Sequence, residues 1–164
     1  MTVSVMDAFV IQLEQHCDKR GSFQELLSRK VCPEFNCVQI NCSVSKKGVL
    51  RGIHINEYAK LVYCVRGSVF DVVVDTRHWS KTFGKWHGVE LNQNNAIYIP
   101  PHCGHGFLSL EEDSILIYAQ DGFYNEKNEW SVRYDDPTLN IAWLGQPLII
   151  SEKDMNAPLL IDYD

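Results

Sequence analysis

Five polar side chains occur where the packing of apolar strands would not select them: Arg51, His54, Lys60, His105 and Tyr118. An imidazole titrates near neutral pH, so a histidine in such a place can act as a general acid or base. A lysine or an arginine can bind an anion through charge-assisted hydrogen bonds. These residue types therefore suggest acid–base chemistry on a small anionic ligand.

Each of these residues also has an ordinary structural interpretation. A single histidine near glycine is more often a packing residue, and Lys60 alone fits a solvated edge strand. A tyrosine after aliphatic residues is usually a core aromatic, and Arg51 alone fits a surface ion pair of small energy. Asp154 lies three residues after Ser151, the spacing of a helix-capping pair. The interpretation of the site therefore depends on the residues in combination.

The sequence gives little support for a metal site. A tight site needs three or four well-placed histidine, cysteine or carboxylate ligands. The position two residues after His54 is Asn56, and Glu57 follows directly. His102 and His105 are three residues apart in a proline-containing turn rather than on a helix. We therefore expect no bound metal.

Motifs for other common chemistries are also missing from the sequence. It contains no Gly-x-Ser-x-Gly elbow, no P-loop and no Gly-x-Gly-x-x-Gly, so we expect neither hydrolase chemistry nor an ATP or NAD cofactor. The formal net charge is −6, from 15 basic and 21 acidic residues, which argues against a nucleic-acid partner.

Length and composition fit one soluble globular domain, which we expect to span residues 1–164. Hydrophobic residues make up 45% and charged residues 22% of the chain. No apolar stretch reaches the roughly 20 residues needed to span a bilayer, and Met1–Val10 lacks the basic residues of a signal peptide. Six cysteines form no Cys-x-x-Cys pair, so we expect reduced thiols and a cytoplasmic protein.

Short β-rich runs between glycine- and proline-containing turns predict an all-β fold. The expected strands cover residues 49–55, 60–65, 68–75, 87–91, 96–99 and 114–120, with Gly104 and Gly106 interpreted as turn residues. Some of these runs are apolar on both faces, which indicates strands buried between two layers. A double-sheet jelly roll provides those layers and can hold a ligand in its mouth.

Alternation along the strands predicts which side chains share a face. Residues two apart in a strand point the same way, so Lys60, Val62 and Cys64 share one face, which we assign to the interior. Helical signal is sparse. Phe23–Lys30 has the length for two turns, and Ser151–Asp154 predicts a second short helix.

Longer motifs follow one another in order from about residue 18 to residue 160, and together they are far more specific than any one of them. They are Arg20–Phe23, Gln39–Asn41, Gly48–His54, Lys60–Val62, Arg66–Asp75, Gly84–Trp86, Ile99-Pro100, His105–Leu108, Asp135–Pro137 and Leu148–Asp154. This series resembles the dTDP-4-dehydrorhamnose 3,5-epimerase family. The resemblance implies a cupin-type jelly roll, usually a homodimer, that needs neither a metal nor an organic cofactor.

The resemblance also implies roles for individual residues. His54 corresponds to the general base, Asp154 to its carboxylate partner, Lys60 to the cation at the enolate oxygen, and Tyr118 to the acid on the opposite face. The remaining matches are implied contacts to the nucleotide-sugar substrate: Arg20, Glu25, Gln39, Asn41, Arg51, His105, Tyr124, Glu129 and Lys153.

The implied chemistry is consistent with the residue types. A proton next to a ketone is acidic only if the enolate is stabilised, which a cation at the carbonyl oxygen does in a water-poor pocket. A neutral histidine oriented by a carboxylate can remove that proton, and inversion needs a donor on the other face. We therefore expect inversion at carbon 3, carbon 5 or both of a nucleotide-linked 4-keto-6-deoxy sugar.

One departure from the family pattern leaves alternatives open. Family members usually have a longer segment between the base and the lysine, with Tyr-Gln after the histidine, whereas here only residues 55–59 intervene. The alternatives are a single-centre epimerase, a GDP-4-keto-heptose epimerase, a non-catalytic sugar-nucleotide-binding cupin and a metal-dependent cupin oxygenase. The sequence alone leaves the nucleotide and the sugar undetermined.

Overall fold

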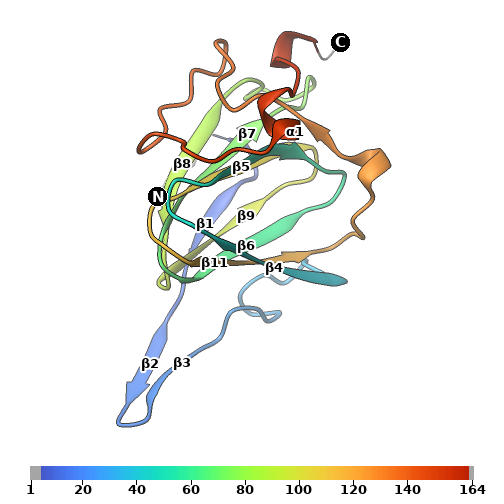
Figure 1. Ribbon diagram of the computed structural model, residues 1–164. Helices are drawn as coiled ribbons and strands as arrows, with labels where there is room; N and C mark the ends of the chain where they lie inside the picture. Colours follow the sequence, from blue (N-terminus) through green and yellow to red (C-terminus); the bar gives the residue numbers. More distant parts are fainter. Residues whose placement is uncertain (1–4, 163–164) are drawn as a thin grey trace.

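The computed structural model describes residues 5–162 and consists mainly of two antiparallel β-sheets packed face to face (Figure 1). In the first sheet the strand order is β1 (Phe9–Gln12), β9 (Asn95–Ile99), β6 (Lys60–Arg66), β11 (Ser114–Gln120), β4 (Gln39–Ser45). In the second it is β12 (Trp130–Ser131), β5 (Leu50–Ile55), β10 (Cys103–Ser109), β7 (Val69–Asp75), β8 (Trp86–Leu91). The expected all-β, double-sheet jelly roll is confirmed.

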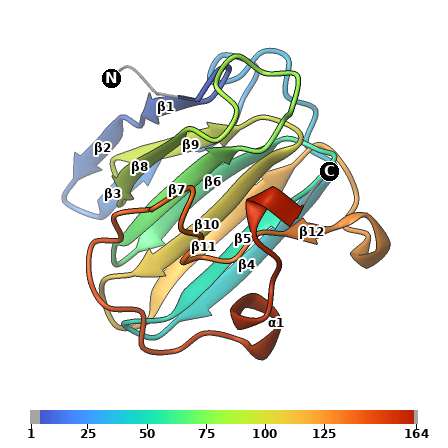
Figure 2. The same ribbon diagram turned by 90° about the horizontal axis from the view of Figure 1, so that it is seen from above.

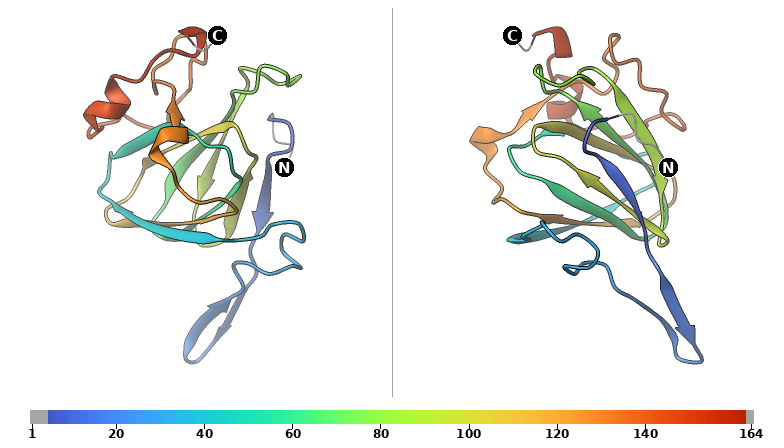
Figure 3. Two further views of the ribbon diagram at one scale, coloured as in Figure 1. Left: turned by 90° about the vertical axis from the view of Figure 1, so that its right-hand side faces the viewer. Right: turned by 180° about the vertical axis from the view of Figure 1, so that it is seen from behind.

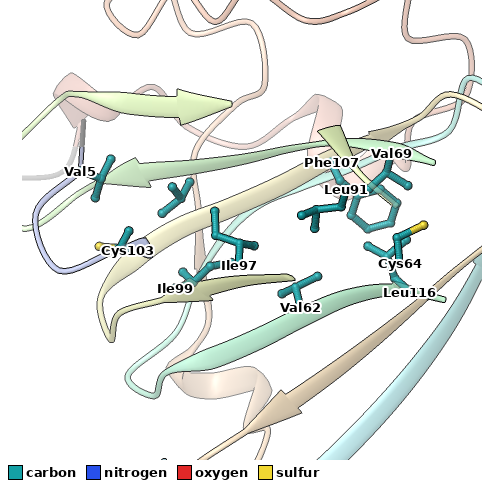
Figure 4. Close-up of a cluster of buried hydrophobic side chains, with 12 residues drawn as sticks. Val5, Val62, Cys64, Val69, Leu91, Ile97, Ile99, Cys103, Phe107 and Leu116 are labelled. Carbon is teal, nitrogen blue, oxygen red and sulfur yellow. The ribbon is translucent and has the colours of Figure 1, made fainter. Parts of the chain in front are cut away.

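The space between the two sheets is filled by alternate side chains of both layers (Figure 4). Val62, Cys64 and Leu116 point inward from the first sheet, and Phe107 and Val69 meet them from the second. The interior position assigned to Val62 and Cys64 is thereby confirmed. Burial of these apolar side chains is the main stabilising contribution, at about 1.5–3 kcal/mol for each fully buried large residue.

Two glycines bring β5 and β10 unusually close together. A Cβ atom at Gly104 would lie 2.5 Å from Cγ2 of Ile53, and one at Gly106 would lie 3.0 Å from the carbonyl oxygen of Arg51. The interpretation of Gly104 and Gly106 as turn residues was therefore wrong, because both lie inside β10. Glycine occurs in strands where another part of the chain approaches closely.

A separate two-stranded ribbon, β2 (Gln15–Asp18) and β3 (Gly21–Gln24), extends away from the body of the protein (Figures 1 and 3). The helix expected over Phe23–Lys30 was wrong. Phe23 pairs with His16 in the ribbon. Beyond it, the Ser28 hydroxyl accepts the N–H groups of Lys30 and Val31, and this local bonding stabilises a turn instead of a helix.

The few helices are short, and one of them forms as the sequence predicts. α1 (Glu152–Met155) begins after Ser151, whose hydroxyl accepts the N–H of Asp154 at 3.1 Å. Two 3₁₀ turns, η1 (Glu126–Asn128) and η2 (Leu160–Asp162), complete the set within residues 5–162. The C-terminal segment packs on the outer face of the second sheet (Figure 2), where Val132, Leu139 and Leu160 belong to one buried cluster.

Candidate active site

His54 and Asp154 form a direct pair although they are 100 residues apart in the chain. Nε2 of His54, on β5, lies 2.7 Å from Oδ1 of Asp154, on α1. The other carboxylate oxygen accepts the backbone N–H of Gly52 at 3.1 Å. The carboxylate is almost fully buried, whereas the His54 side chain is 29% exposed. Asp154 therefore fixes the orientation of the imidazole, and part of the imidazole remains exposed at the wall of a cavity.

The surroundings of Asp154 keep this carboxyl ionised. Burial alone raises its pKa, but the hydrogen bond and the charge of His54, with the N–H of Gly52, outweigh that effect and leave the pKa below its usual value. A carboxylate that stays charged holds the imidazole in one orientation and stabilises its protonated form.

A second histidine–carboxylate pair lies beside the first. His105, on β10, faces His54 across the β5–β10 ladder, and its Nε2 lies 2.8 Å from Oδ2 of Asp71 on β7. Both side chains are buried, and burial lowers the pKa of His105 despite the nearby Asp71. Oδ1 of Asp71 has no hydrogen-bond partner among the described residues. Asp71 was not singled out from the sequence, although it interrupts an apolar run.

Lys60 begins β6 and is 7% exposed. Burial lowers the pKa of its ammonium group to about 8, although Glu129 and Asp71 oppose the shift. A lysine with this pKa carries its charge at neutral pH and can still lose it in mildly alkaline solution. Lys60 is thus a buried cation that is influenced by the carboxylates of Glu129 and Asp71.

Tyr118 lies on β11 in the opposite sheet from His54. Its hydroxyl is 2.8 Å from Oγ of Ser43 on β4, and its ring meets that of His105 edge to face at a centroid distance of 6.1 Å. Burial raises the pKa of Tyr118, so the phenol keeps its proton at neutral pH. Ser43, its hydroxyl partner, was also not singled out from the sequence.

A cavity of about 570 Å³ opens beside the His54–Asp154 pair. Six of the residues singled out from the sequence line it: Arg51, His54, Tyr124, Glu129, Lys153 and Asp154. Nζ of Lys153 lies 2.8 Å from Oε1 of Glu129, and the Asn56 amide donates to the other oxygen at 3.4 Å. Burial raises the pKa of Glu129, but Lys153 and His54 reverse the effect and leave it lowered. The cavity therefore contains charges of both signs.

Gln39 and Asn41 extend this polar region along β4. The Gln39 amide donates to Oδ1 of Asn41 at 2.9 Å, and its Oε1 accepts the N–H of Tyr124 at 3.1 Å. Asn41 donates in turn to Gln120 on β11. These bonds connect the edge of the first sheet to the segment that carries Tyr124.

Seven of the thirteen residues singled out from the sequence do not line the cavity: Gln39, Asn41, Lys60, His105, Tyr118, Arg20 and Glu25. Arg20 and Glu25 are the two that lie in or next to the β2–β3 ribbon. Arg20 is at the tip of the β2–β3 ribbon and is paired with Asp18, while Glu25 follows the ribbon and accepts a hydrogen bond from Ser28. Neither lines the cavity. Within one chain they are therefore not part of the candidate site.

Residues 5–162 contain neither a cluster of metal-ligating side chains nor a helix suited to span a membrane. No group of three or more histidine, cysteine or acidic side chains in this range is arranged to hold a metal ion. In the same range no helix combines the length and the apolar character that crossing a membrane requires.

His54 and Asp154 line the cavity, and Lys60 on β6 and Tyr118 on β11, which do not line it, add the remaining members of an acid–base set. A histidine held by a carboxylate accepts a proton, a buried ammonium stabilises negative charge, and a protonated tyrosine donates. Such a set can remove a proton from a carbon next to a carbonyl group and return a proton to it.

Comparison with known proteins agrees with this chemistry. The family model described as dTDP-4-dehydrorhamnose 3,5-epimerase matches residues 2–162. The enzyme of that name from Shigella flexneri is 39% identical over 171 residues, covering 98% of this chain and 94% of its own. NovW, a 4-keto-6-deoxy sugar epimerase from Streptomyces spheroides, superposes with a TM-score of 0.93 at 36% identity, covering 98% and 86%.

A third similar protein has been solved with a ligand. The dTDP-6-deoxy-D-glucose-3,5-epimerase of Legionella pneumophila, in complex with dTDP-4-keto-L-rhamnose, superposes with a TM-score of 0.92 at 36% identity. The alignment covers 98% of this chain and 91% of that one.

Fold, site and similarity together define the chain as an isomerase of the cupin-type jelly-roll class. It belongs to the dTDP-4-dehydrorhamnose 3,5-epimerase family. The resemblance of the sequence motifs is thereby confirmed.

Proposed function

We propose that this protein epimerises a dTDP-linked 4-keto-6-deoxy sugar at carbons 3 and 5, with His54 as the base. The observation that carries the proposal is the 2.7 Å pair of His54 and the buried Asp154 at the wall of the cavity. Membership of the epimerase family supports the reaction class, and the ligand named for the Legionella protein supports the substrate class.

His54 starts the reaction by removing a proton from the carbon next to the ketone. Its Nε2 is bonded to Asp154, so Nδ1 is the nitrogen left to accept the proton. The ionised Asp154 stabilises the imidazolium that forms. The electrons of the broken C–H bond move to the ketone oxygen and give an enolate.

Lys60 and Tyr118 complete the proposed cycle. The Lys60 ammonium stabilises the enolate oxygen, and its environment excludes most water, which strengthens the interaction. Tyr118 donates its phenolic proton to the carbon from the opposite side. His54 and Tyr118 are on different sheets, so they can act on opposite faces of a sugar ring bound between them.

The nucleotide is proposed to bind at the mouth of the cavity. Arg51 and Lys153 are exposed cations on its wall and suit a diphosphate, and Tyr124, about half exposed, can stack on the base. Glu129, Gln39, Asn41 and the buried His105 contribute polar contacts nearer the sugar.

Proton–deuterium exchange in heavy water tests the function directly. The protein is incubated with dTDP- and GDP-linked 4-keto sugars, and the carbons that gain deuterium are counted by NMR. We expect exchange and inversion at carbons 3 and 5 of the dTDP-linked 6-deoxy sugar. Exchange at one carbon would identify a single-centre epimerase, and tight binding without any exchange would identify a non-catalytic binding protein.

The proposed reaction needs no metal. No group of three or more histidine, cysteine or acidic side chains among residues 5–162 is arranged as a ligand set, and the Asn56 side chain, two residues after His54, donates to Glu129. We therefore expect full activity after exhaustive treatment with a chelator. Loss of activity that one added divalent ion restores would show instead that a metal takes part.

The protein is further proposed to act as a homodimer in the cytoplasm. The β2–β3 ribbon is almost entirely exposed, and β4 forms a sheet edge with Ile40 and Val44 exposed on it. An exposed edge and apolar row of this kind favour association with a second copy. All six cysteines are free thiols, which supports a reducing compartment.

Light scattering tests the assembly. We expect a mass of twice the 18.8 kDa chain at micromolar concentration. In the dimer, Arg20 and Glu25 of the ribbon would reach the site of the partner, so Arg20→Ala should weaken dTDP binding without changing the mass. A single-chain mass at micromolar concentration would contradict the dimer.

A further inference from the structure

Tyr58 lies in the four-residue connection Asn56–Ala59 between β5 and β6, directly before the proposed oxyanion lysine. The connection is held to the chain segment after β11 by two hydrogen bonds. The N–H of Ala59 donates to Oδ1 of Asp121 at 2.8 Å, and the N–H of Asp121 donates to the carbonyl oxygen of Ala59 at 3.2 Å. These two bonds hold the backbone at Ala59, directly after Tyr58, and the N–H of His102 donates to the carbonyl oxygen of Asn56 at 2.8 Å on the other side.

The neighbouring segment also leaves space for the Tyr58 side chain. A Cβ atom at Gly122 would lie 2.6 Å from Cβ of Tyr58, so any residue larger than glycine would displace the tyrosine. Burial raises the pKa of Tyr58 to about 12, so the phenol is neutral when the enzyme works.

The ring of Tyr58 faces the ammonium group of Lys60. Nζ lies 5.9 Å from the ring centroid, within the range of a cation–π interaction. Charged and titratable groups on other elements also act on Lys60: Glu129 before β12, Asp71 on β7 and His105 on β10. None of the described carboxylates forms an ion pair with Lys60. The Tyr58 ring is a neighbour of the ammonium group and presents its face to it.

We infer that Tyr58 is a positioning residue for the epimerisation, because the face of its ring keeps the Lys60 ammonium charged and aimed at the forming enolate oxygen. This inference rests on the function proposed above. The ring attracts only the charged form of the lysine, and the interaction is stronger in a desolvated site than at the surface. A ring contact also leaves all three N–H groups of the ammonium free to bind the oxygen.

The contact predicts a specific shift in pH dependence. The protonated Lys60 is the active form, so activity falls as pH rises through its pKa, near 8. Tyr58→Leu removes the π face and keeps apolar bulk, so it should move this basic limb of kcat/KM to lower pH by about 0.5–1.5 units. Tyr58→Phe keeps the ring and should leave the limb where it is.

Two further variants separate the ring contact from general packing. Gly122→Ala keeps Tyr58 in the chain but pushes it away from Lys60, and it should shift the limb in the same direction as Tyr58→Leu. Phe123→Leu replaces an exposed aromatic residue next to Gly122 and should cause no shift. In parallel, NMR titration of the ε-carbon of Lys60, assigned with Lys60→Met, measures its pKa without any turnover.

Two results would overturn the inference: an unchanged Lys60 titration in Tyr58→Leu, or an equal shift in Tyr58→Phe, which would assign the effect to the hydroxyl. The proposed function is judged separately by the wild-type protein. If the wild-type protein gives no epimerisation, the function fails, while the NMR titration still decides whether the Tyr58 ring holds the ammonium.

Discussion

His54→Asn abolishes measurable exchange of the sugar protons with heavy water, while binding of dTDP remains. The expectation follows from the position of this imidazole: it lines the cavity, and because Nε2 is bonded to Asp154, Nδ1 is the nitrogen left to accept a proton. Removal of a general base typically slows a reaction by on the order of 10²–10⁴. Exchange is followed by NMR, and dTDP binding by calorimetry.

The control for this variant has to separate catalysis from folding. Loss of His54 leaves Oδ1 of the buried Asp154 without its partner, which can destabilise the protein by about 1–3 kcal/mol. His102→Asn makes the same change outside the cavity, at a residue whose φ of 62° asparagine tolerates. It should exchange normally. Wild-type turnover by His54→Asn would exclude His54 as the base.

Tyr118→Phe is expected to separate exchange from inversion. An enolate reprotonated by His54 returns to its starting configuration, and only a donor on the other face inverts the carbon. The phenylalanine variant should therefore incorporate deuterium from heavy water but yield little epimerised product. The substitution keeps the ring volume, so the packing against His105 and Phe107 changes little.

The alternative role of Tyr118 predicts a different result. If its hydroxyl serves only to bond Ser43, its loss destabilises the protein by roughly 1–3 kcal/mol, and exchange and inversion fall together or not at all. Tyr98→Phe is the matched control, because Tyr98 packs on the outer face of the same sheet. Measuring both rates on one sample decides between the two roles, and equal fractional losses would remove Tyr118 from the role of acid.

Local pattern predicted the layers of the fold well but not every strand. Alternation and turn residues located most of the central strands, and the Ser151 spacing located α1. Gly104 and Gly106 were misinterpreted because glycine weakens strand propensity, whereas the close approach of β5 requires it. The helix expected over Phe23–Lys30 did not form because Phe23 and Gln24 pair with β2 and the Ser28 hydroxyl stabilises a turn after the ribbon.

For the site, too, local sequence pattern marked individual residues but not the contacts between residues far apart in the chain. Pattern alone marked His54, Lys60 and Tyr118 as polar residues in apolar runs, but the pairing of His54 with Asp154 spans 100 residues and came only from the family resemblance. Asp71 could have been found by the rule that marked Lys60, since it is a charged residue in a buried strand. Arg20 and Glu25 lie outside the cavity, and their expected role depends on the proposed second chain.

The proposed base and acid belong to different sheets, and this has a consequence for how the enzyme could change. Strands within a sheet are joined by backbone hydrogen bonds, whereas the two sheets are kept apart only by side chains such as Phe107 and Leu116. The clearance between His54 and Tyr118 therefore depends on the bulk of the apolar residues packed between the sheets. A smaller or larger residue there would narrow or widen the space for the ring and leave both reactive groups intact. In this architecture, the size of the apolar side chains between the sheets thus determines how wide a sugar ring the site accepts.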